Sequence, residues 1–338
     1  MRTIVCTNPG HLDYKKEIKP ILTPGNALVK VKRIGICGTD LHAFEGTQPF
    51  FSYPRILGHE ISGELVELDN APGFQIGEEV TFIPYFNCKN CIACRAGKPN
   101  CCVNIKVFGV HIDGGMMEFI SVPSHLLVHG EGLSLDELAL VEPLAIGAHG
   151  IKRGGVKKDD FVLVVGAGPI GLAAMEFARI AGAKVIAMDV NNNRLGFCRE
   201  KLKIEHLINP LYSTVAEQLK AITKGDMPQV IVDATGNQKA INQTFQYMAH
   251  GGTYVLIGLQ KHEISFSHPE FHKREGTLMS SRNATRNDFE HVIDSIRSGL
   301  INPSAYITHR VSFEQVNDNF QSWLNPATEI IKAMVSIG

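Results

Sequence analysis

The sequence predicts an α/β protein that combines a β-rich domain with a doubly wound parallel sheet, and three observations support this class. The chain has 338 residues, and a single hydrophobic core rarely grows beyond about 250–300 residues, so we expect two domains. The first 130 or so residues contain short apolar runs separated by Gly, Pro and Asp-Gly turns, which indicates β-structure. From about Pro143, strand-like and helix-like segments alternate, which is typical of βαβ units and a parallel sheet covered on both faces.

Each predicted element follows from a local pattern. The early strands are expected at Ala27–Ile34, Ile61–Leu68, Glu79–Ile83 and Phe119–Val122. The alternating part is expected to contain strand Phe161–Val165, helix Ile170–Ala181, and strands Lys184–Asp189, Gln229–Asp233 and Thr253–Ile257. After about Arg282 the pattern weakens, and we expect helix Asp288–Ser298 and strand-like runs Ile307–Val311 and Ile331–Ile337.

The composition excludes several classes of partner. Lysine and arginine number 33 against 34 acidic residues, a net charge of −1, so bulk electrostatics favours neither nucleic acid nor a membrane. The first residues lack the apolar core of a signal peptide. The longest apolar stretch, Phe161–Met175, contains three glycines and Pro169 and is too short to span a bilayer. We therefore expect a cytoplasmic protein, whose cysteines stay reduced and favour metal over disulfides.

Half of the eight cysteines lie close together, at Cys88, Cys91, Cys94 and Cys102. This spacing suits one tetrahedral Zn²⁺ with no open position, which is a structural site. A reduced cluster without metal would bring several thiolates together without a cation, which is electrostatically costly. An iron–sulfur cluster is the other alternative, but its common bacterial spacing brings the fourth cysteine after about three residues and follows it with proline.

The segment Gly166–Gly171 has the pattern GxGxxG, with Pro169 and Ile170 between its last two glycines. It directly follows a predicted strand and opens a predicted helix, which is the context that a dinucleotide-binding turn requires. Gly166 permits the tight turn, Gly168 lets the backbone approach a pyrophosphate, and Gly171 allows close helix–strand packing. The free N–H groups at the start of the helix would then stabilise the phosphates.

The next strand ends at Asp189, 18 residues after Gly171. An acid there would hydrogen-bond the ribose hydroxyls and repel a 2′-phosphate, so NAD is expected rather than NADP. Arg194, five residues further on, weakens this preference, and an ordinary surface acid is the alternative interpretation of Asp189. Further residues at the carboxyl ends of later strands are expected along the cofactor: Thr235, Gly236, Ile257 and Gly258.

A second metal site is suggested by Cys37, within Gly35–His42, and by His59 and Glu60 in Gly58-His59-Glu60. A thiolate, an imidazole and a carboxylate could hold Zn²⁺ and leave one position for water or substrate. Taken singly, Cys37 could be a small buried residue, and His59 could be a core histidine whose hydrogen bonds are all made within the protein. Their occurrence together with the other motifs favours the metal site.

The chain resembles the zinc-dependent medium-chain dehydrogenases in its motifs and in their order. These motifs are, in sequence, the Gly35–His42 segment, Gly58-His59-Glu60, the four-cysteine lobe, Glu142-Pro-Leu and the GxGxxG turn. These include alcohol, sorbitol and threonine dehydrogenases. Within the family, longer stretches are similar to bacterial sugar-acid dehydrogenases that oxidise L-galactonate or L-gulonate at C5. These stretches are Gln48–Pro54, Gly109–Gly115, Asp233–Gln238 and Ser281–Thr285.

The resemblance implies a GroES-like catalytic domain built from both chain ends, residues 1–144 and 283–338, with a zinc lobe at about 86–103. A Rossmann domain, residues 145–282, would be inserted between them, with the active site in the cleft. It also implies NAD as cofactor and two zinc ions per subunit, one catalytic and one structural. Relatives form dimers or tetramers, so a homo-oligomer is expected.

The family's catalytic residues map onto this chain at several positions. Cys37 and His59 match direct zinc ligands, while Glu60 and Glu142 match carboxylates that bind zinc directly or through water. Which carboxylate binds directly stays open, and Glu142 stands where other alcohol dehydrogenases have a second cysteine. Thr39 and His42 match the relay that carries the substrate proton toward solvent, and a histidine side chain can carry a proton near neutral pH.

A sugar acid also needs a cation for its carboxylate. Arg282 is the first choice because a guanidinium makes bidentate contacts that lysine cannot. Lys273 and Arg274 are alternatives, although either could belong to a solvated charged loop. Aromatic residues that could wall the substrate, or simply pack in the core, are Phe50, Phe51 and Tyr53.

Other activities remain open at this stage. Sorbitol-type polyols, threonine and simple alcohols are alternative substrates within the family. A zinc-free quinone reductase on the same scaffold would leave Cys37, His59 and the four-cysteine lobe without a role. A non-enzymatic NAD-binding protein would tolerate loss of Thr39 and His42, yet both are present.

Overall fold

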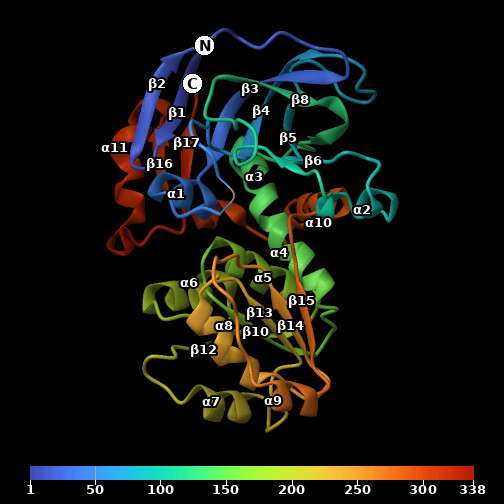
Figure 1. The fold of residues 1–338 in the computed structure, drawn as a ribbon, viewed down its shortest axis with the longest axis vertical. Helices are drawn as coiled ribbons and strands as arrows, with labels where there is room; N and C mark the ends of the chain where they lie inside the picture. The colour runs from blue at the N-terminus through green and yellow to red at the C-terminus, as the bar shows by residue number, and fades with distance from the viewer. Residues whose placement is uncertain (50) are drawn as a thin grey trace. The chain divides into compact units, whose positions relative to one another are not determined.

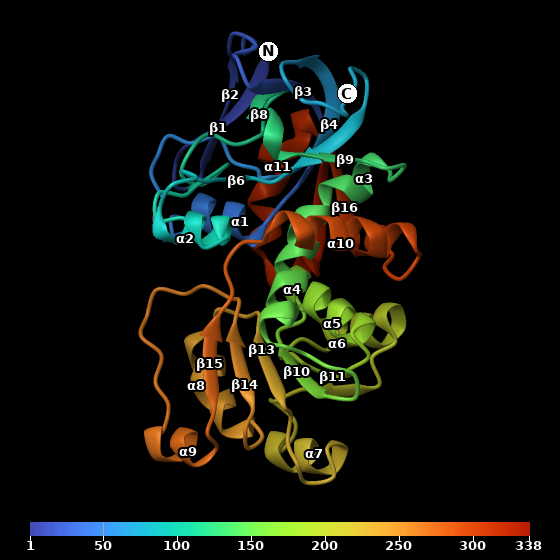
Figure 2. The ribbon, with the colours of Figure 1, turned by 90° about the vertical axis from the view of Figure 1, so that its right-hand side faces the viewer.

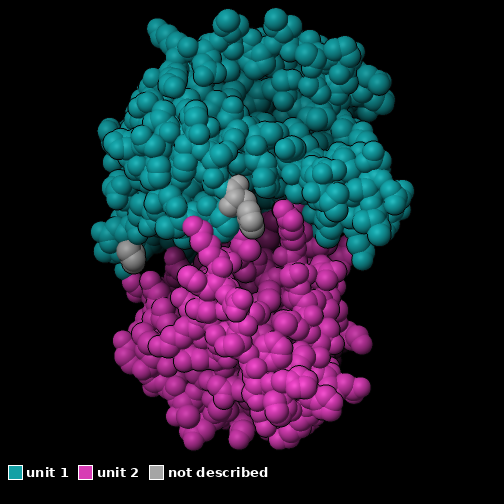
Figure 3. All heavy atoms as spheres, in the orientation of Figure 1, with its two compact units in different colours: residues 1–143, 285–338 teal, residues 144–284 magenta. Residues whose placement is uncertain are grey.

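The computed structural model describes residues 1–49 and 51–338, and the chain forms two compact units (Figure 3). Unit 1 contains Met1–Pro143 and Thr285–Gly338, and unit 2 contains Leu144–Ala284. Both chain ends therefore belong to unit 1. Among the described residues, no helix has the length and apolar character needed to cross a membrane.

Unit 1 is built around a sheet in the order β16-β17-β3-β4-β5-β9, with β8 also paired to β3 (Figure 1). Two small sheets, β1-β2 and β6-β7, complete its β-structure. The strands are β1 (Arg2–Asn8), β2 (His11–Lys16), β3 (Asn26–Gly35), β4 (Glu60–Leu68), β5 (Glu79–Phe82), β6 (Tyr85–Phe86), β7 (Lys106–Val107), β8 (Phe119–Pro123), β9 (Leu127–His129), β16 (Ile307–Ser312) and β17 (Lys332–Ser336). The helices are α1 (Gly38–Glu45), α2 (Ile92–Arg95), α3 (Leu135–Ala139), α10 (Arg286–Arg297) and α11 (Val316–Phe320).

The central strand of unit 1, β3, joins the two ends of the chain. It pairs antiparallel with β4 and β8 and, at its end, with the C-terminal strand β17. Apolar residues of these strands, among them Val31, Ile61 and Val335, are buried in one hydrophobic core. Burial of such side chains contributes about 1.5–3 kcal/mol each, which holds the C-terminal segment in this unit.

Unit 2 contains a six-stranded parallel sheet in the order β12-β11-β10-β13-β14-β15, and Figure 2 shows most of these strands side by side. This is the doubly wound order, and the strand order reverses between β10 and β13. The strands are β10 (Phe161–Val165), β11 (Lys184–Met188), β12 (His206–Ile208), β13 (Val230–Asp233), β14 (Thr253–Leu256) and β15 (Thr277–Ser280). The helices are α5 (Pro169–Ile180), α6 (Asn192–Leu202), α7 (Val215–Ile222), α8 (Gln238–Thr244) and α9 (His268–Lys273).

Helix α4 (Val141–Arg153) runs from the end of unit 1 into unit 2. Short 3₁₀ turns lie at Pro99–Cys101, Ser124–Leu126, Phe245–Tyr247, Pro303–Tyr306, Phe313–Gln315, Ser322–Leu324 and Pro326–Thr328. The predicted fold class, a β-rich domain with a doubly wound parallel sheet, is confirmed by these two sheets.

Candidate functional site

Three potential metal ligands meet in unit 1. Donor atoms of Cys37, His59 and Glu60 all lie within 4.8 Å of one another. Cys37 follows β3 and caps the start of α1, while His59 and Glu60 stand where β4 begins. Nδ1 of His59 is buried without a hydrogen-bond partner among the described residues. A thiol, a carboxylate and an imidazole with an unsatisfied nitrogen form a donor set that fits zinc.

The charges around this group attract a cation. Burial on its own would lower the pKa of His59, but the negative charges of Cys37 and Asp40 raise that pKa well above its usual range. Asp40 is itself buried, and burial raises the pKa of its carboxyl. The imidazole therefore lies in a strongly negative environment, which a divalent cation would neutralise.

Lys332, which the sequence did not predict as a site residue, also reaches this group. Its Nζ donates to Oε1 and Oε2 of Glu60 at 2.6 and 2.7 Å and to the carbonyl oxygen of Ile36 at 3.0 Å. Lys332 is 2% exposed and Glu60 0% exposed. Burial would lower the pKa of Lys332, but the negative charges of Glu60 and Cys37 raise it above its usual value. Glu60 therefore already has a cationic partner within the protein.

Glu142, the other predicted carboxylate, lies outside the 4.8 Å group. It is buried at the start of α4, and the hydroxyl of Tyr85 donates to its Oε1. Burial raises the pKa of Glu142, and the charges of His59 and Lys332 act in the opposite direction. Glu142 thus faces the same charged surroundings and is oriented by a tyrosine that the sequence did not indicate.

Helix α1 carries the predicted relay residues. Asp40 Oδ2 accepts from the backbone N–H of Cys37 at 2.9 Å, and Oδ1 accepts from that of Gly58 at 3.0 Å. This carboxylate ties together the loops that carry Cys37 and His59. Thr39 and His42 are three residues apart and therefore share one face of the helix. The exposed ring of His42 has Nδ1 3.2 Å from Oγ1 of Thr47.

The four-cysteine lobe is assembled as a compact sulfur cluster. The sulfurs of Cys88, Cys91, Cys94 and Cys102 lie within 4.8 Å of one another. Backbone N–H groups of Cys94 and Val103 lower the pKa of Cys91 to about 6. Burial, by contrast, raises the pKa of Cys94. Four sulfurs this close together fit a tetrahedral zinc ion with no open position.

The glycine-rich turn of unit 2 lies between β10 and α5. Gly166 has a φ of +97°, and a Cβ at Gly171 would lie 1.8 Å from the carbonyl oxygen of Gly166. Glycine is therefore required at positions 166 and 171. Pro169 begins α5, where its missing N–H costs nothing. Gly168, Pro169 and Ile170 at the start of this helix are half-buried, and the N-terminus of a helix is a favourable place for a pyrophosphate.

Asp189 follows β11 and contacts this turn. Its Oδ2 accepts from the N–H of Ala167 at 2.6 Å, and its Oδ1 accepts from that of Asn191 at 2.8 Å. The side chain of Arg194 lies close by, with Nη1 3.9 Å from the position of a Cβ on Gly168. The carboxylate and the guanidinium thus flank the turn that was predicted to bind the dinucleotide.

The predicted cofactor residues of the later strands lie in two adjoining loops, one of which contacts the same turn. Thr235 and Gly236 follow β13, and Ile257 and Gly258 follow β14. A Cβ at Gly166 would lie 2.8 Å from Cγ2 of Thr235. The structure therefore brings these loops together at the carboxyl edge of the sheet, where open α/β sheets bind ligands.

The predicted substrate residues lie apart from one another in the chain. Arg282 is exposed shortly after β15, in unit 2, whereas Phe51 is half-buried in unit 1 beside Tyr53, with ring centroids 4.9 Å apart. Phe50 lies outside the described residues. Arg274 donates to the carbonyl oxygens of Met248, Glu270 and Gln246, which is a structural role. Lys273 and Arg274 precede β15 and so lie at its amino end.

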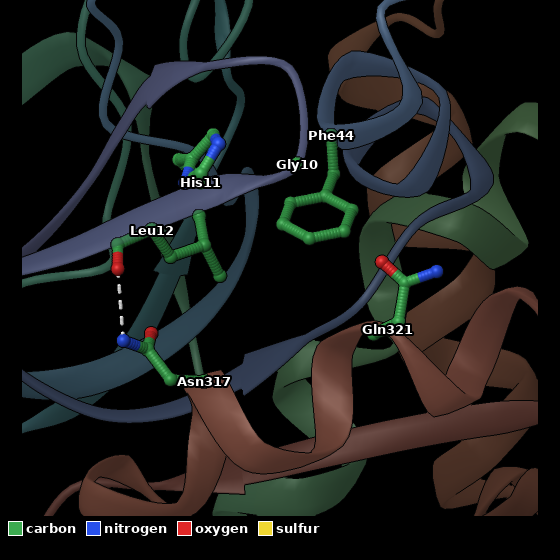
Figure 4. Close-up of a pocket in the computed structure, with 6 residues that line it drawn as sticks. All are labelled: Gly10, His11, Leu12, Phe44, Asn317 and Gln321. Atoms are coloured by element: carbon green, nitrogen blue, oxygen red, sulfur yellow. Dashed lines mark hydrogen bonds between the residues drawn. The ribbon is translucent and has the colours of Figure 1, made fainter.

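A pocket in unit 1 is separate from these candidate sites (Figure 4). Its lining comes from the β1–β2 turn, α1 and the region of α11: Gly10, His11, Leu12, Phe44, Asn317 and Gln321. Asn317 Nδ2 donates to the carbonyl oxygen of Leu12 at 2.8 Å. This contact ties α11 to β2, and none of the metal-site residues lines the pocket.

Two family models match the chain. That of the alcohol dehydrogenase GroES-like domain matches residues 23–131, and that of the zinc-binding dehydrogenases matches residues 169–298. The chain is 43% identical to the L-galactonate-5-dehydrogenase of Escherichia coli K12 over 99% of both proteins. It is 30% identical to a sorbitol dehydrogenase of Halalkalibacterium halodurans over 93% of this chain and 94% of that protein.

A solved dehydrogenase structure is also similar to this chain. The crystal structure of an alcohol dehydrogenase (rspB) from E. coli CFT073, complexed with NADH, matches with a TM-score of 0.92 and 30% identity over 99% of both chains. The fold and the donor sets define a zinc-type alcohol dehydrogenase. The chain belongs to the zinc-dependent medium-chain alcohol dehydrogenase family. The predicted family and the class of zinc- and NAD-dependent oxidoreductase are confirmed.

Proposed function

We propose that this protein oxidises a secondary alcohol of a sugar acid, such as L-galactonate or L-gulonate at C5, to a keto-acid with NAD. The observation that carries the proposal is the 43% identity to an L-galactonate-5-dehydrogenase over nearly the whole of both chains. The donor set in unit 1 and the dinucleotide turn in unit 2 provide the chemistry that such a reaction needs.

In this proposal, Cys37 and His59 hold the catalytic zinc, and Glu60 or Glu142 completes its ligands. Bound zinc lowers the pKa of an alcohol, and NAD accepts the hydride. Thr39 receives the hydroxyl proton, and His42 passes it to solvent because its ring is exposed. The second zinc is held by the four-cysteine lobe and stabilises the fold.

The dinucleotide binds across Gly166–Gly171, with its pyrophosphate at the start of α5. Asp189 accepts from the ribose hydroxyls and disfavours a 2′-phosphate, so NAD is preferred over NADP. Thr235, Gly236, Ile257 and Gly258 line the cofactor at the neighbouring strand ends. Arg194 flanks the turn without reversing this preference.

Arg282 binds the substrate carboxylate, because a guanidinium can contact both of its oxygens. Phe51 provides an apolar wall for the sugar chain. The protein works as a homo-oligomer, a dimer or a tetramer. A reducing cytoplasm is the compartment that this proposal expects, because both sets of thiolates must stay unoxidised.

A substrate screen tests the proposal directly. The zinc-loaded protein is incubated with NAD and with hexonates, polyols or amino acids, and NADH formation is followed by its absorbance. L-Galactonate or L-gulonate should give the highest kcat/KM. A higher kcat/KM for sorbitol would instead assign the activity of the sorbitol dehydrogenase relative, and a higher value for threonine would also refute the sugar-acid assignment.

A further inference from the structure

A buried acid lies at the point where the order of the parallel sheet reverses. Asp233 is the last residue of β13, and its relative exposure is 0%. Its carboxylate accepts hydrogen bonds from the N–H groups of Thr235 and Gly236, both at 3.1 Å. It also accepts from the hydroxyl of Thr235, whose Oγ1 lies 2.9 Å from Oδ2. One side chain therefore fixes the loop that follows its own strand.

The backbone of the same residue fixes the next loop. The carbonyl oxygen of Asp233 accepts from the N–H groups of Ile257 at 2.9 Å and Gly258 at 3.0 Å. The N–H of Ala234 donates to the carbonyl oxygen of Val165, at the end of β10, at 2.9 Å. The loops after β10, β13 and β14 are thus linked through residues 233 and 234.

These loops pack with no space for another side chain. A Cβ on Gly258 would lie 2.2 Å from the nitrogen of Gly236, and a Cβ on Gly236 would lie 2.5 Å from the carbonyl oxygen of Leu259. A shift of Thr235 or Gly236 would therefore move the loop after β14 as well. It would also change the contact between Thr235 and the glycine-rich turn at Gly166.

The hydroxyl of Thr235 extends the network into the following helix. It accepts from the N–H of Asn237 at 2.9 Å while donating to Asp233. Asn237 is the N-cap of α8, where its side chain accepts from the N–H of Ala240 at 3.1 Å. The carboxylate, the hydroxyl and the helix cap form one continuous chain of hydrogen bonds.

We propose that Asp233 is a positioning residue for the dinucleotide, because its carboxylate holds Thr235 and Gly236 where they border the binding edge. The proposal rests on the assignment of Thr235, Gly236, Ile257 and Gly258 to the cofactor. Asp233 acts through these loops and does not itself contact the dinucleotide.

The chemistry of the group supports this role. A buried carboxylate is costly unless several donors surround it, and burial raises the pKa of Asp233 to about 6. A neutral acceptor would fill the same space at lower cost to stability. Only an ionised carboxylate, however, accepts on both oxygens without offering a competing donor.

The test is the binding of NADH to the zinc-loaded, full-length protein, which needs no knowledge of the substrate. Asp233→Asn keeps the shape but replaces one acceptor oxygen with a donor group. We expect its Kd for NADH to rise about tenfold, as for the loss of a hydrogen bond to a charged group. With any substrate that the protein oxidises, the KM for NAD should rise while kcat changes little.

A second pair of variants separates positioning from stability. Thr235→Val removes the hydroxyl from the same network and should also weaken NADH binding, even if Asp233→Asn fails to fold. Thr244→Val is the matched control in the same unit, since this buried hydroxyl donates to the carbonyl oxygen of Ala240 at 2.9 Å. It should lower the thermal midpoint and leave the Kd for NADH unchanged.

Unchanged NADH affinity in Asp233→Asn and Thr235→Val would overturn the inference. Equal losses of affinity in Thr235→Val and Thr244→Val would overturn it too, because general destabilisation would then explain the effect. If the wild-type protein binds NADH but does not oxidise sugar acids, the substrate assignment fails and this inference stands. Absence of NADH binding by the wild-type protein would refute the cofactor assignment and the inference together.

Discussion

The ammonium group of Lys332 donates to both carboxylate oxygens of Glu60, at 2.6 and 2.7 Å. Lys332 lies on β17 and Glu60 on β4, the two strands on either side of β3. Gly35 of β3 pairs with Met334 on one side and with Glu60 on the other. A Cβ on Gly35 would lie 2.2 Å from Oε2 of Glu60. The glycine therefore leaves the space through which the lysine reaches the acid.

This contact bears on the charge of the proposed metal site. The ionised side chains of Cys37, Glu60 and Glu142 would carry one negative charge each, so a zinc ion alone would leave the site near −1. The positive charge of Lys332 cancels this excess, and buried Asp40 is one further acid beside His59. Neutralisation by a buried residue explains how two carboxylates can lie close to a single thiolate.

The first prediction concerns this ion pair. Lys332→Met should lower the free energy of unfolding by about 3–5 kcal/mol, because it leaves the buried carboxylate of Glu60 without its partner. Urea denaturation measures the change. The double variant Lys332→Met/Glu60→Leu should recover much of the loss, since apolar replacement of a whole buried pair is often neutral.

An exposed lysine gives the matched control. Lys19 contacts Glu67 at 3.0 Å, but both side chains are more than 40% exposed. Lys19→Met should therefore cost only about 0–1 kcal/mol. Similar losses in Lys19→Met and Lys332→Met would show that the buried pair contributes no more than a surface contact.

Local patterns in the sequence predicted four of the six strands of the doubly wound sheet, and missed the short edge strands β12 and β15. The apolar run Phe161–Val165 became β10, and the helix predicted at Ile170–Ala181 is α5 at Pro169–Ile180. Turn residues lie at both ends of each segment and therefore mark where the strand or helix begins and ends. Strand β2 had no such signal, because His11–Lys16 is mostly exposed and mostly polar. Its pairing with β1 depends on register, which periodicity does not show.

The candidate site was only partly visible in the sequence. Cys37, His59 and Glu60 stood out because their residue types and short motifs are unusual together. Lys332 gave no signal, since it lies in an apolar run and its partner is 272 residues away. Tyr85 was equally hidden, 57 residues from Glu142. Such pairs arise from the pairing of distant strands and helices, which a single sequence does not specify.

The second prediction concerns metal content. The donor sets are separate, so elemental analysis of the wild-type protein should find about two zinc ions per chain. Cys94→Ser should remove the zinc of the lobe and lower the thermal midpoint. Cys37→Ser should remove the other zinc and abolish NAD reduction while the lobe keeps its metal. A wild-type protein with a single tightly held zinc would contradict the proposed catalytic site.

The third prediction concerns the choice of cofactor. Asp189 has a carboxylate that would repel the 2′-phosphate of NADPH, so NADH should bind more tightly. Asp189→Asn removes the charge and keeps one acceptor oxygen, which can serve the N–H of Ala167 or that of Asn191 but not both. The ratio of the Kd for NADPH to the Kd for NADH should fall about tenfold, which is the size expected for the loss of one repulsive charge contact. Equal Kd values for NADH and NADPH in the wild-type protein would refute the preference.

The fourth prediction concerns Arg282 and the carboxylate of the substrate. Arg282→Ala should lower kcat/KM for L-galactonate by about tenfold to a hundredfold, as for loss of a charged hydrogen bond. It should leave kcat/KM for galactitol, which has no carboxylate, little changed. Arg274→Ala is the control, because that guanidinium binds backbone carbonyl oxygens. Equal effects of Arg282→Ala on kcat/KM for both substrates would show that Arg282 does not bind the carboxylate.

The fifth prediction concerns stability and pH. Burial raises the pKa of Asp233 from 3.8 to about 6, so the folded protein holds this proton more tightly than the unfolded chain. The stability contributed by the protonated form is therefore complete below the unfolded pKa and is lost as pH rises through the folded pKa. Between pH 5 and pH 7.5 the ionisation should lower the free energy of unfolding by about 1–2 kcal/mol.

Asp233→Asn removes this ionisation and isolates its effect. Urea denaturation of both proteins across this pH range gives two curves, and their difference cancels the contributions of other groups, including the zinc thiolates. The wild-type protein should lose stability relative to the variant as pH rises. A difference that stays constant with pH would mean that the buried carboxylate is stabilised fully by its donors. If the predicted loss is found together with weaker NADH binding in the variant, the ionised acid costs stability and serves the cofactor site, as is common for functional groups.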